Sequence, residues 1–238
     1  MTSGKLKRFR NRRQAGALLG AHLAEFESVE PLVLGLLRGG VPVAFEAAQA
    51  LGADLDLFLV RKLGVPGQSE LAFGAIADGG VQVFNERVIN QAGLGRSLIE
   101  KIARQQEHEL ARRARFYRGE RPPASIAGRT VFLVDDGMAT GASMRAAILA
   151  LSYQKPHAIV PAVPVAPQQA VADLHSFCPT SAGSMPAAPA APVRRAVALL
   201  TPSPFWGVGA WYDDFRQVKD AEVIRLLDAS AQPGSGSL

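Results

Sequence analysis

Several residue types that other protein classes depend on are scarce in this chain. Only one of its 238 residues, Cys178, is a cysteine. An internal disulfide is therefore excluded, and a reducing compartment is the expected setting. No apolar run approaches the roughly 18 to 20 residues that a membrane-spanning helix needs. The basic residues 1–13 lack the apolar stretch of a secretory signal. We expect a cytoplasmic protein that is not a membrane protein.

Motifs of several other enzyme classes are missing as well. The 4 histidines have no metal-ligand spacing, and with a single cysteine they do not predict a zinc site. No serine lies in a Gly-x-Ser-x-Gly pattern, which removes support for the hydrolases that use that turn. No Gly-x-x-x-x-Gly-Lys-Ser/Thr loop occurs, which argues against an ATPase.

Positive charge exceeds negative charge, with a formal net charge of +5. Six of the basic residues cluster near the start of the chain: Lys5, Lys7, Arg8, Arg10, Arg12 and Arg13. Phe9 is the only aromatic residue among them, whereas proteins that bind single-stranded nucleic acid interleave several aromatic residues with their charges. We interpret the cluster as a solvated segment and helix face, and we do not expect nucleic acid as a partner. A modest positive balance also suits a ligand with several phosphates.

Alternating strand and helix patterns indicate an α/β protein. Mostly apolar runs, typical of strands buried on both faces, occupy 32–37, 55–60, 130–134 and 158–165, and a further strand is predicted at 193–200, which includes Arg194 and Arg195. Helical spacing is found at 11–26, 41–51, 94–117, 143–151 and 168–174, and Asn11 with Gln14 forms a capping box at the start of the first. This order predicts one domain over residues 1–238, with a central, mostly parallel sheet flanked by helices.

Three segments depart from the alternation. Residues 64–68 (GVPGQ) have the composition of a loop. Residues 72–76 and 81–84, joined across Asp78-Gly79-Gly80, predict a hairpin. Residues 182–192 are rich in alanine and proline without periodicity, which predicts a flexible surface excursion.

The most informative segment follows the predicted strand 130–134. That strand ends in two adjacent carboxylates, Asp135 and Asp136, and a short loop then leads into a helix near Ser143. Ligands of open parallel sheets bind beyond the carboxyl ends of the strands. The loop supplies backbone N–H groups, hydroxyls and a helix N-terminus, which together favour an anion. Carboxylates beside such a loop suit sugar hydroxyls or Mg²⁺. These features predict a ribose phosphate site.

The same segment, 131–143 (VFLVDDGMATGAS), closely resembles the phosphoribosyl pyrophosphate signature of the type I phosphoribosyltransferases. The resemblance implies their α/β fold with a small hood, and transfer of a phosphoribosyl group to a nitrogenous, nucleobase-like acceptor with release of pyrophosphate and use of Mg²⁺. Asp135 and Asp136 would bind the ribose hydroxyls, directly or through Mg²⁺, and so are the implied metal residues. The donor would contact the loop Gly137, Met138, Ala139, Thr140, Gly141, Ala142 and Ser143, of which 139–143 would surround the 5′-phosphate.

Two upstream segments resemble other parts of these enzymes. Residues 37–40 (LRGG) are similar to the pyrophosphate loop, in which Arg38, Gly39 and Gly40 would approach the leaving group. In the family, a mobile hood follows the strand that here ends near Val60, and its closure would exclude water. Arg61 and Lys62 would neutralise the departing pyrophosphate. The resemblance thus makes Arg38 and Lys62 candidates for catalysis, beside the two aspartates.

A C-terminal aromatic segment is the candidate hood over the acceptor, within residues 202–228. Both tryptophans of the chain lie in 204–215 (PFWGVGAWYDDF). In phosphoribosyltransferases an aromatic residue of the hood often stacks on the acceptor base, and Trp211, Tyr212 and Phe215 are the candidates. The alternative is that these aromatic residues pack in the core.

The resemblance extends over about 9–227, in the style of bacterial phosphoribosyltransferases of unassigned substrate. It departs from the purine-salvage members at Ala139, where they carry an aspartate thought to handle the base proton. Purine salvage by that mechanism is therefore not favoured. Two alternatives stay open: a regulatory protein that senses phosphoribosyl pyrophosphate without turnover, with a basic segment that contacts nucleic acid, and hydrolysis or phosphorolysis on the same scaffold. The partners expected are a small-molecule donor and acceptor and, by default, a second copy in a homodimer.

Overall fold

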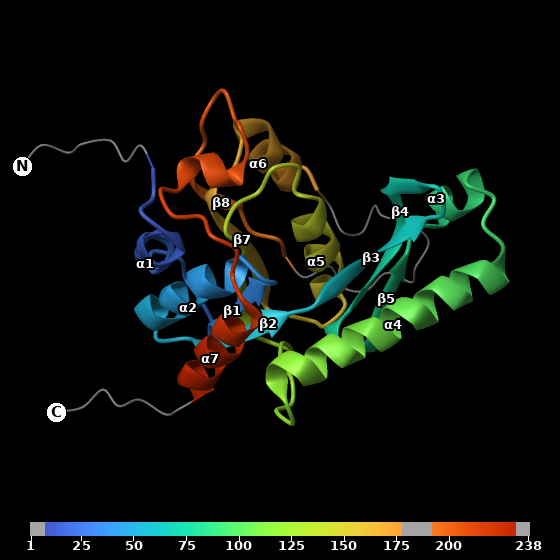
Figure 1. Ribbon diagram of the computed structural model, residues 1–238, viewed down its shortest axis with the longest axis horizontal. Coiled ribbons are helices and arrows are strands. Elements are labelled where there is room, and N and C mark those ends of the chain that lie inside the picture. Colours follow the sequence, from blue (N-terminus) through green and yellow to red (C-terminus); the bar gives the residue numbers. More distant parts are fainter. Residues whose placement is uncertain (1–7, 178–191, 232–238) are drawn as a thin grey trace, which may run out of the picture.

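A parallel five-stranded sheet forms the centre of the fold (Figure 1). The computed structural model describes residues 8–177 and 192–231. The strands lie in the order β2-β1-β6-β7-β8, and every neighbouring pair is parallel. Their bounds are β1 Leu32–Leu36, β2 Asp54–Phe58, β6 Thr130–Val134, β7 Ala158–Val165 and β8 Val197–Leu200. Every residue of β1, β6 and β7 is buried, as the continuous apolar runs predict.

Helices cover both faces of this sheet. On one face α1 (Arg12–Leu23) and α2 (Gly40–Leu51) pack against alternate strand residues such as Val33 and Phe132. The opposite face, which includes Leu34 and Leu133, packs against α5 (Ala142–Ser152) and α6 (Gln168–His175). The two sets of helices lie on opposite sides of the sheet in Figure 1. The predicted central sheet flanked by helices is therefore confirmed.

A second sheet of three antiparallel strands lies beside the first, in the order β3-β4-β5. Its strands are β3 Val60–Val65, β4 Gln68–Ala77 and β5 Val81–Phe84, and it is followed by α3 (Glu86–Gln91) and the long α4 (Arg96–Arg118). Figure 1 shows α4 running along this sheet. The predicted hairpin is confirmed, and both Gly79 and Gly80 in its turn have positive φ.

Three predictions about elements need correction. The apolar run predicts a single strand over 55–60, but the chain leaves the parallel sheet after Phe58 and enters the antiparallel sheet at Val60. Of the predicted loop 64–68, only Pro66 and Gly67 form the turn between β3 and β4. β8 begins at Val197 instead of residue 193, and Val193 makes an isolated bridge to Ile159. An apolar run does not reveal at which residue a strand changes its neighbours.

The C-terminal part contains elements that the sequence did not predict. A short 3-10 helix, η3 (Val208–Trp211), precedes α7 (Asp220–Ala231), which buries Val223, Leu226 and Leu227. Of the predicted excursion 182–192, all but Pro192 lies outside the described residues. Among the helices of the described segments, none has both the length and the apolar character needed to cross a membrane.

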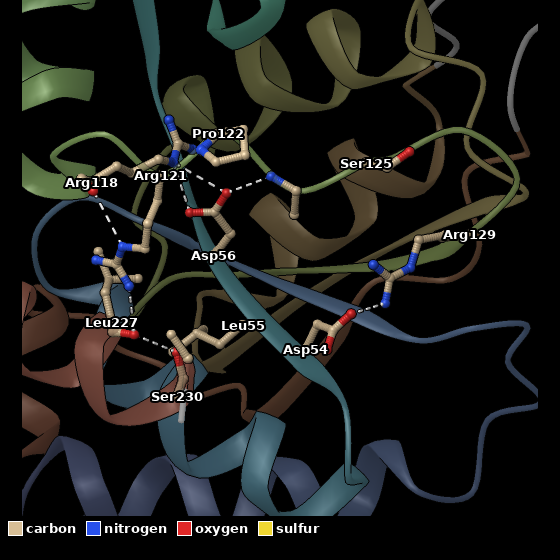
Figure 2. Close-up of a pocket in the computed structure, with 12 residues that line it drawn as sticks. Asp54, Leu55, Asp56, Arg118, Arg121, Pro122, Ser125, Arg129, Leu227 and Ser230 are labelled. Carbon is tan, nitrogen blue, oxygen red and sulfur yellow. Dashed lines mark hydrogen bonds and ion pairs between the residues drawn. The ribbon is translucent and has the colours of Figure 1, made fainter. Parts of the chain in front are cut away.

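One buried arginine joins the two sheets. Arg118, the last residue of α4, donates from Nε to Asp56 at 2.9 Å and from Nη2 to Asp78 at 2.8 Å. Asp56 belongs to β2, and Asp78 to the turn between β4 and β5. Figure 2 shows Arg118 beside Asp56 in a cavity of about 480 Å³. Because a buried charge is costly without its partners, this network holds α4 in a defined position against both sheets.

Candidate functional site

The two predicted donor-binding segments meet at the carboxyl edge of the parallel sheet. Asp135 and Asp136 follow β6, and the loop of Gly39 and Gly40 follows the neighbouring β1. A Cβ added at Gly40 would lie 2.6 Å from the Val134 carbonyl oxygen, and one at Gly39 would overlap the Asp136 carboxylate. Glycine is therefore required at both positions by the close approach of the acidic motif.

The acidic pair is electrostatically strained. Burial raises the pKa of Asp135 well above its ordinary value, and the neighbouring Asp136 carboxylate raises it further. Burial also raises the pKa of Asp136, although the positive charge of Arg12 opposes that rise. The Asp136 backbone N–H donates to Asp135 Oδ1 at 2.8 Å. Two half-buried carboxylates in this setting favour a bound cation or hydroxyl donors.

Arg12 is the residue of this site that sequence reasoning missed. Its Nε lies 2.8 Å from Asp136 Oδ2, its Nη1 donates to the Arg216 carbonyl oxygen at 2.8 Å, and its guanidinium lies 3.8 Å from the centre of the Phe215 ring. The Arg12 side chain is only 11% exposed. The expectation that the N-terminal basic cluster is solvated is thus wrong for Arg12. The capping pattern places the helix start at Arg12, but no local signal connects it with Asp136.

Two segments far apart in the sequence, residues 9–11 and 211–213, hold Arg12 in place. The Phe9 N–H donates to the Trp211 carbonyl at 2.8 Å, and the Asp213 N–H donates back to the Phe9 carbonyl at 2.8 Å. The predicted cap of α1 is confirmed, since Asn11 accepts from the Gln14 N–H at 3.0 Å. The residues just before α1 and the segment after η3 therefore form one layer over the acidic pair.

The loop after Asp136 divides into a buried and an exposed part. Met138 is 5% exposed and packs in the core, while its N–H donates to the Val165 carbonyl at 2.9 Å. The side chains of Ala139, Thr140 and Ser143 are exposed. Gly141, with φ of 74°, turns the chain into α5. The exposed hydroxyls and the N-terminus of α5 thus adjoin each other, as an anion site requires.

The predicted basic residues occupy different surroundings. Arg38, which follows a cis peptide bond after Leu37, lies 3.4 Å from Asp220 Oδ1, and the Tyr117 hydroxyl donates to the same oxygen at 2.5 Å. Burial and this hydrogen bond raise the pKa of Tyr117 to about 12. Arg61 donates to Gln106 Oε1 of α4 at 2.5 Å, whereas Lys62 is exposed.

One small cavity brings several of these segments together. Its volume is about 120 Å³. It is lined by residues of the strand ends, the acidic motif, the loop, β3 and α4: Leu36, Leu37, Phe58, Leu59, Val60, Arg61, Leu110, Arg113, Asp135 and Ser143. Asp135, Ser143 and Arg61 therefore face a common space, although they are far apart in sequence.

The three aromatic candidates for stacking differ in exposure. Tyr212 is 2% exposed, its ring packs on Phe9 and Phe215, and its hydroxyl donates to the Asp136 carbonyl at 2.5 Å. Tyr212 thus presents no exposed face to a planar ligand. Its hydroxyl instead holds the backbone of Asp136. Trp211 and Phe215 are half-buried. Trp206, which the sequence analysis did not single out, is 78% exposed.

Comparison with known proteins agrees with this geometry. The family described as the phosphoribosyl transferase domain matches residues 64–176, which include the acidic motif and the loop after it. A crystal structure of TT1426 from Thermus thermophilus superposes with a TM-score of 0.81 at 44% identity, over 94% of this chain and 100% of that one. The chain belongs to the type I phosphoribosyltransferase family. Its α/β fold is the fold that the resemblance predicted.

Two relatives of this chain come from Mycobacterium tuberculosis, strains CDC 1551 and H37Rv. The second is named "Putative phosphoribosyl transferase Rv0571c". Each is 40% identical over 223 residues, which is 94% of this chain and 47% of the relative. The chain therefore spans about half the length of these relatives.

Proposed function

We propose that this chain transfers a phosphoribosyl group from phosphoribosyl pyrophosphate to a nitrogenous, nucleobase-like acceptor and releases pyrophosphate. The observation that carries the proposal is the direct apposition of Gly39 and Gly40 to the Asp135–Asp136 pair. A loop suited to pyrophosphate and carboxylates suited to ribose hydroxyls are thereby joined at one sheet edge. The family membership supports the same reaction class.

The donor has a natural orientation in this site. We place its ribose hydroxyls on Asp135 and Asp136, and its 5′-phosphate on the backbone N–H groups of 139–143 with the hydroxyls of Thr140 and Ser143. The pyrophosphate would lie over Arg38, Gly39 and Gly40, near Arg61 and Lys62. The exposure of Ala139, Thr140 and Ser143 supports this placement, because the phosphate can reach them from solvent.

The acidic pair also fits Mg²⁺. The described residues hold no group of three or more His, Cys, Asp or Glu side chains arranged for a metal. Mg²⁺ commonly takes one or two carboxylates and completes its coordination with substrate oxygens and water. Asp135 and Asp136 would supply those carboxylates, and the ion would neutralise part of the donor's phosphate charge.

The chain's own groups would act mainly by position and charge. The bond from C1 of the ribose to pyrophosphate breaks while a bond from the acceptor nitrogen to C1 forms, and the acceptor nitrogen releases its proton to water. Asp135 and Asp136 hold the ribose and face a sugar that becomes cationic, whereas Arg38, Arg61 and Lys62 stabilise the anionic leaving group. Because residue 139 is alanine, no carboxylate at that position can take the proton.

The acceptor would lie under the segment that follows β8. Among the aromatic candidates, Tyr212 is buried, and the Phe215 ring already lies against Arg12 and Tyr212, whereas Trp211 is half-buried. We therefore propose Trp211 as the residue that contacts the acceptor ring.

Calorimetric titration of the purified chain with phosphoribosyl pyrophosphate, with and without Mg²⁺, tests the donor site. We expect Mg²⁺-dependent binding at micromolar levels, followed by pyrophosphate release with one of a panel of purines, pyrimidines and other amines. Binding without release for any acceptor would favour the regulatory alternative. The absence of binding to folded protein would refute the proposal.

Asp136→Ala is the sharpest single substitution for the site. It removes the carboxylate that contacts both the glycine loop and Arg12, so we expect productive donor binding to be lost. The matched control is Asp173→Ala, because Asp173 is exposed on α6 and bonds only locally to Gln169. Wild-type affinity in Asp136→Ala would contradict the site assignment.

A further inference from the structure

One face of α4 lies against the proposed donor site. The residues of this face recur at helical spacing: Gln106, Glu109, Leu110, Arg113 and Tyr117. Gln106 and Glu109 contact Arg61 of β3, and the Tyr117 hydroxyl reaches Asp220, the partner of Arg38. In the fold, this face contacts Arg61 directly and reaches Arg38 through Asp220, and we assign both arginines to pyrophosphate.

Arg113 stands at the centre of this face and borders two cavities. The first is the cavity of about 120 Å³ that also contains Asp135, Ser143 and Arg61. The second, of about 420 Å³, is lined by Leu37, Arg38, Arg112, Arg113, Phe116, Tyr117 and Asp220. The wall between them is thus formed by Arg113 of α4 together with Leu37 of the pyrophosphate loop. Arg113 is the arginine of α4 that faces both the acidic motif and Arg38.

Around Glu109, the positive charges of neighbouring arginines outnumber the negative charge that pairs with them. Arg61, Arg112 and Arg113 share the carboxylate of Glu109, at 3.7, 2.8 and 2.9 Å. Hydrogen bonds from Arg112 and Arg113 lower the pKa of Glu109 to about 2. Burial and the positive charge of Arg113 lower the pKa of Arg61. Three guanidinium groups around one carboxylate leave an excess that an incoming anion relieves.

The position of α4 is fixed independently of any ligand. Arg118, five residues after Arg113, is anchored to Asp56 and Asp78 of the two sheets. Because a helix is stiff over so short a distance, Arg113 is presented from a rigid element. A guanidinium held in this way suits a phosphate group, to which it can donate two parallel hydrogen bonds.

We infer that Arg113 is a further binding residue for the pyrophosphate group, and that Arg112 supports it from the same turn of α4. The inference rests on the proposed function, because it adds a contact to the same donor site. When the bond between C1 and pyrophosphate breaks, the leaving group keeps the electron pair, and Arg113 stabilises the added negative charge. Glu109 competes with this role, since it holds Arg113 in the absence of an anion.

Pyrophosphate binding in the presence of Mg²⁺ tests the inference directly. The dissociation constant is measured calorimetrically for the full chain at fixed ionic strength. We expect Arg113→Ala to bind pyrophosphate about tenfold or more weakly, because a charge-assisted hydrogen bond is lost. Arg113→Lys should retain part of the affinity. Glu109→Gln should bind pyrophosphate more tightly than the wild type, and this gain should shrink when Arg113→Ala is also present. A general rise in positive charge would leave the gain unchanged.

Arg96→Ala is the matched control. Arg96 lies in the first turn of the same helix, its side chain is 93% exposed, and it pairs with Glu100. We expect its pyrophosphate affinity to equal that of the wild type. Circular dichroism melting shows whether each variant is folded, and if Arg113→Ala is unfolded, Arg113→Lys and Glu109→Gln decide the question.

The possible outcomes separate the inference from the proposed function. If the wild type binds and transfers but Arg113→Ala keeps full pyrophosphate affinity, the inference is wrong and the proposed function stands. If the wild type binds pyrophosphate and Arg113→Ala does not, while no acceptor is ever converted, the inference stands and the transfer activity is refuted. A wild type that binds neither donor nor pyrophosphate refutes both.

Discussion

At the scale of single residues, the site depends on how closely charged groups are packed around Asp136. Its carboxylate adjoins the position that a Cβ of Gly39 would occupy, and its other near neighbour is the guanidinium of Arg12. The backbone carbonyl of Asp136 accepts from Tyr212. Removal of Arg12 would leave this carboxylate without its charged partner, and this makes the free energy of unfolding sensitive to pH.

Replacement of Arg12 by alanine tests that sensitivity. We expect the free energy of unfolding at pH 8 to fall by about 1–3 kcal/mol, because a buried carboxylate loses its charged hydrogen-bond donor. Burial raises the folded-state pKa of Asp136 and Arg12 opposes that rise, so the variant should have a still higher pKa. A carboxyl whose pKa is higher in the folded state than in the unfolded state lowers the free energy of unfolding when it is ionised. As the pH falls below the folded-state pKa, the carboxyl becomes protonated and this loss shrinks, and it disappears below the unfolded-state pKa of about 3.9.

Urea denaturation between pH 4 and pH 8 measures the effect. The deficit of Arg12→Ala relative to the wild type should shrink towards pH 4. A useful comparison is Arg8→Ala, since Arg8 pairs only loosely with Asp213 at 3.8 Å and its side chain is 53% exposed. A deficit that is constant over the whole range would show that Asp136 is not the group involved.

At the scale of elements, α4 links the two sheets and carries residues of the site. Its C-terminal Arg118 binds Asp56 and Asp78, while Gln106 and Glu109 contact Arg61 of β3. Sequence periodicity predicted this helix from its apolar positions. It did not distinguish arginines that bind within the protein from arginines that face solvent, because both kinds occupy similar positions in the pattern.

Arg118→Ala should destabilise the chain strongly. Two buried carboxylates would lose their common partner, and we expect the free energy of unfolding to fall by about 3–5 kcal/mol. Chemical denaturation followed by circular dichroism measures this change. Arg115→Ala on the same turn provides the control, since Arg115 is exposed and its substitution should change stability by about 0.5 kcal/mol at most. Equal effects of the two substitutions would contradict a linking role for Arg118.

At the scale of the whole molecule, distant parts of the chain converge on one sheet edge. The residues before α1 bond to the segment after η3, and that segment leads on to Asp220 at the start of α7, which reaches Arg38. Phe9 is fully buried against Tyr212, which in turn supports Asp136. Residues 9–12 and 211–216 thus cover the acidic motif, and the core and the site are stabilised together.

Phe9→Ala tests this coupling. Loss of a fully buried phenylalanine should reduce the free energy of unfolding by about 3–5 kcal/mol. Because Tyr212 would lose its packing partner, donor affinity should also fall at temperatures at which the variant is still folded. Thermal melting and calorimetric titration with phosphoribosyl pyrophosphate measure the two effects. Leu18→Ala, at an exposed position of α1, should alter neither stability nor donor affinity. If Phe9→Ala keeps the donor affinity of the wild type, the packing of Phe9 does not support the site.

Local physical signals account for what the sequence alone determined. The continuous apolar runs of 130–134 and 158–165 predicted β6 and β7 with their observed bounds, because strands of a parallel sheet are buried on both faces. The carboxylates after β6 and the loop that follows them predicted a ribose phosphate site, because residue type and position at a strand end carry that information. The glycines after β1 were assigned to pyrophosphate only through the resemblance to the family. These parts of the site are encoded within short segments.

Only the tertiary structure decided the features that depend on contacts between distant segments. The change of sheet at Leu59, the ion pair of Arg12 with Asp136, the burial of Tyr212 and the placement of Arg113 between two cavities all join residues far apart in the chain. A periodic pattern shows which face of an element is buried, but not which neighbour covers it. For that physical reason, the sequence was enough to propose a donor-binding motif, and the fold determined which charges surround it.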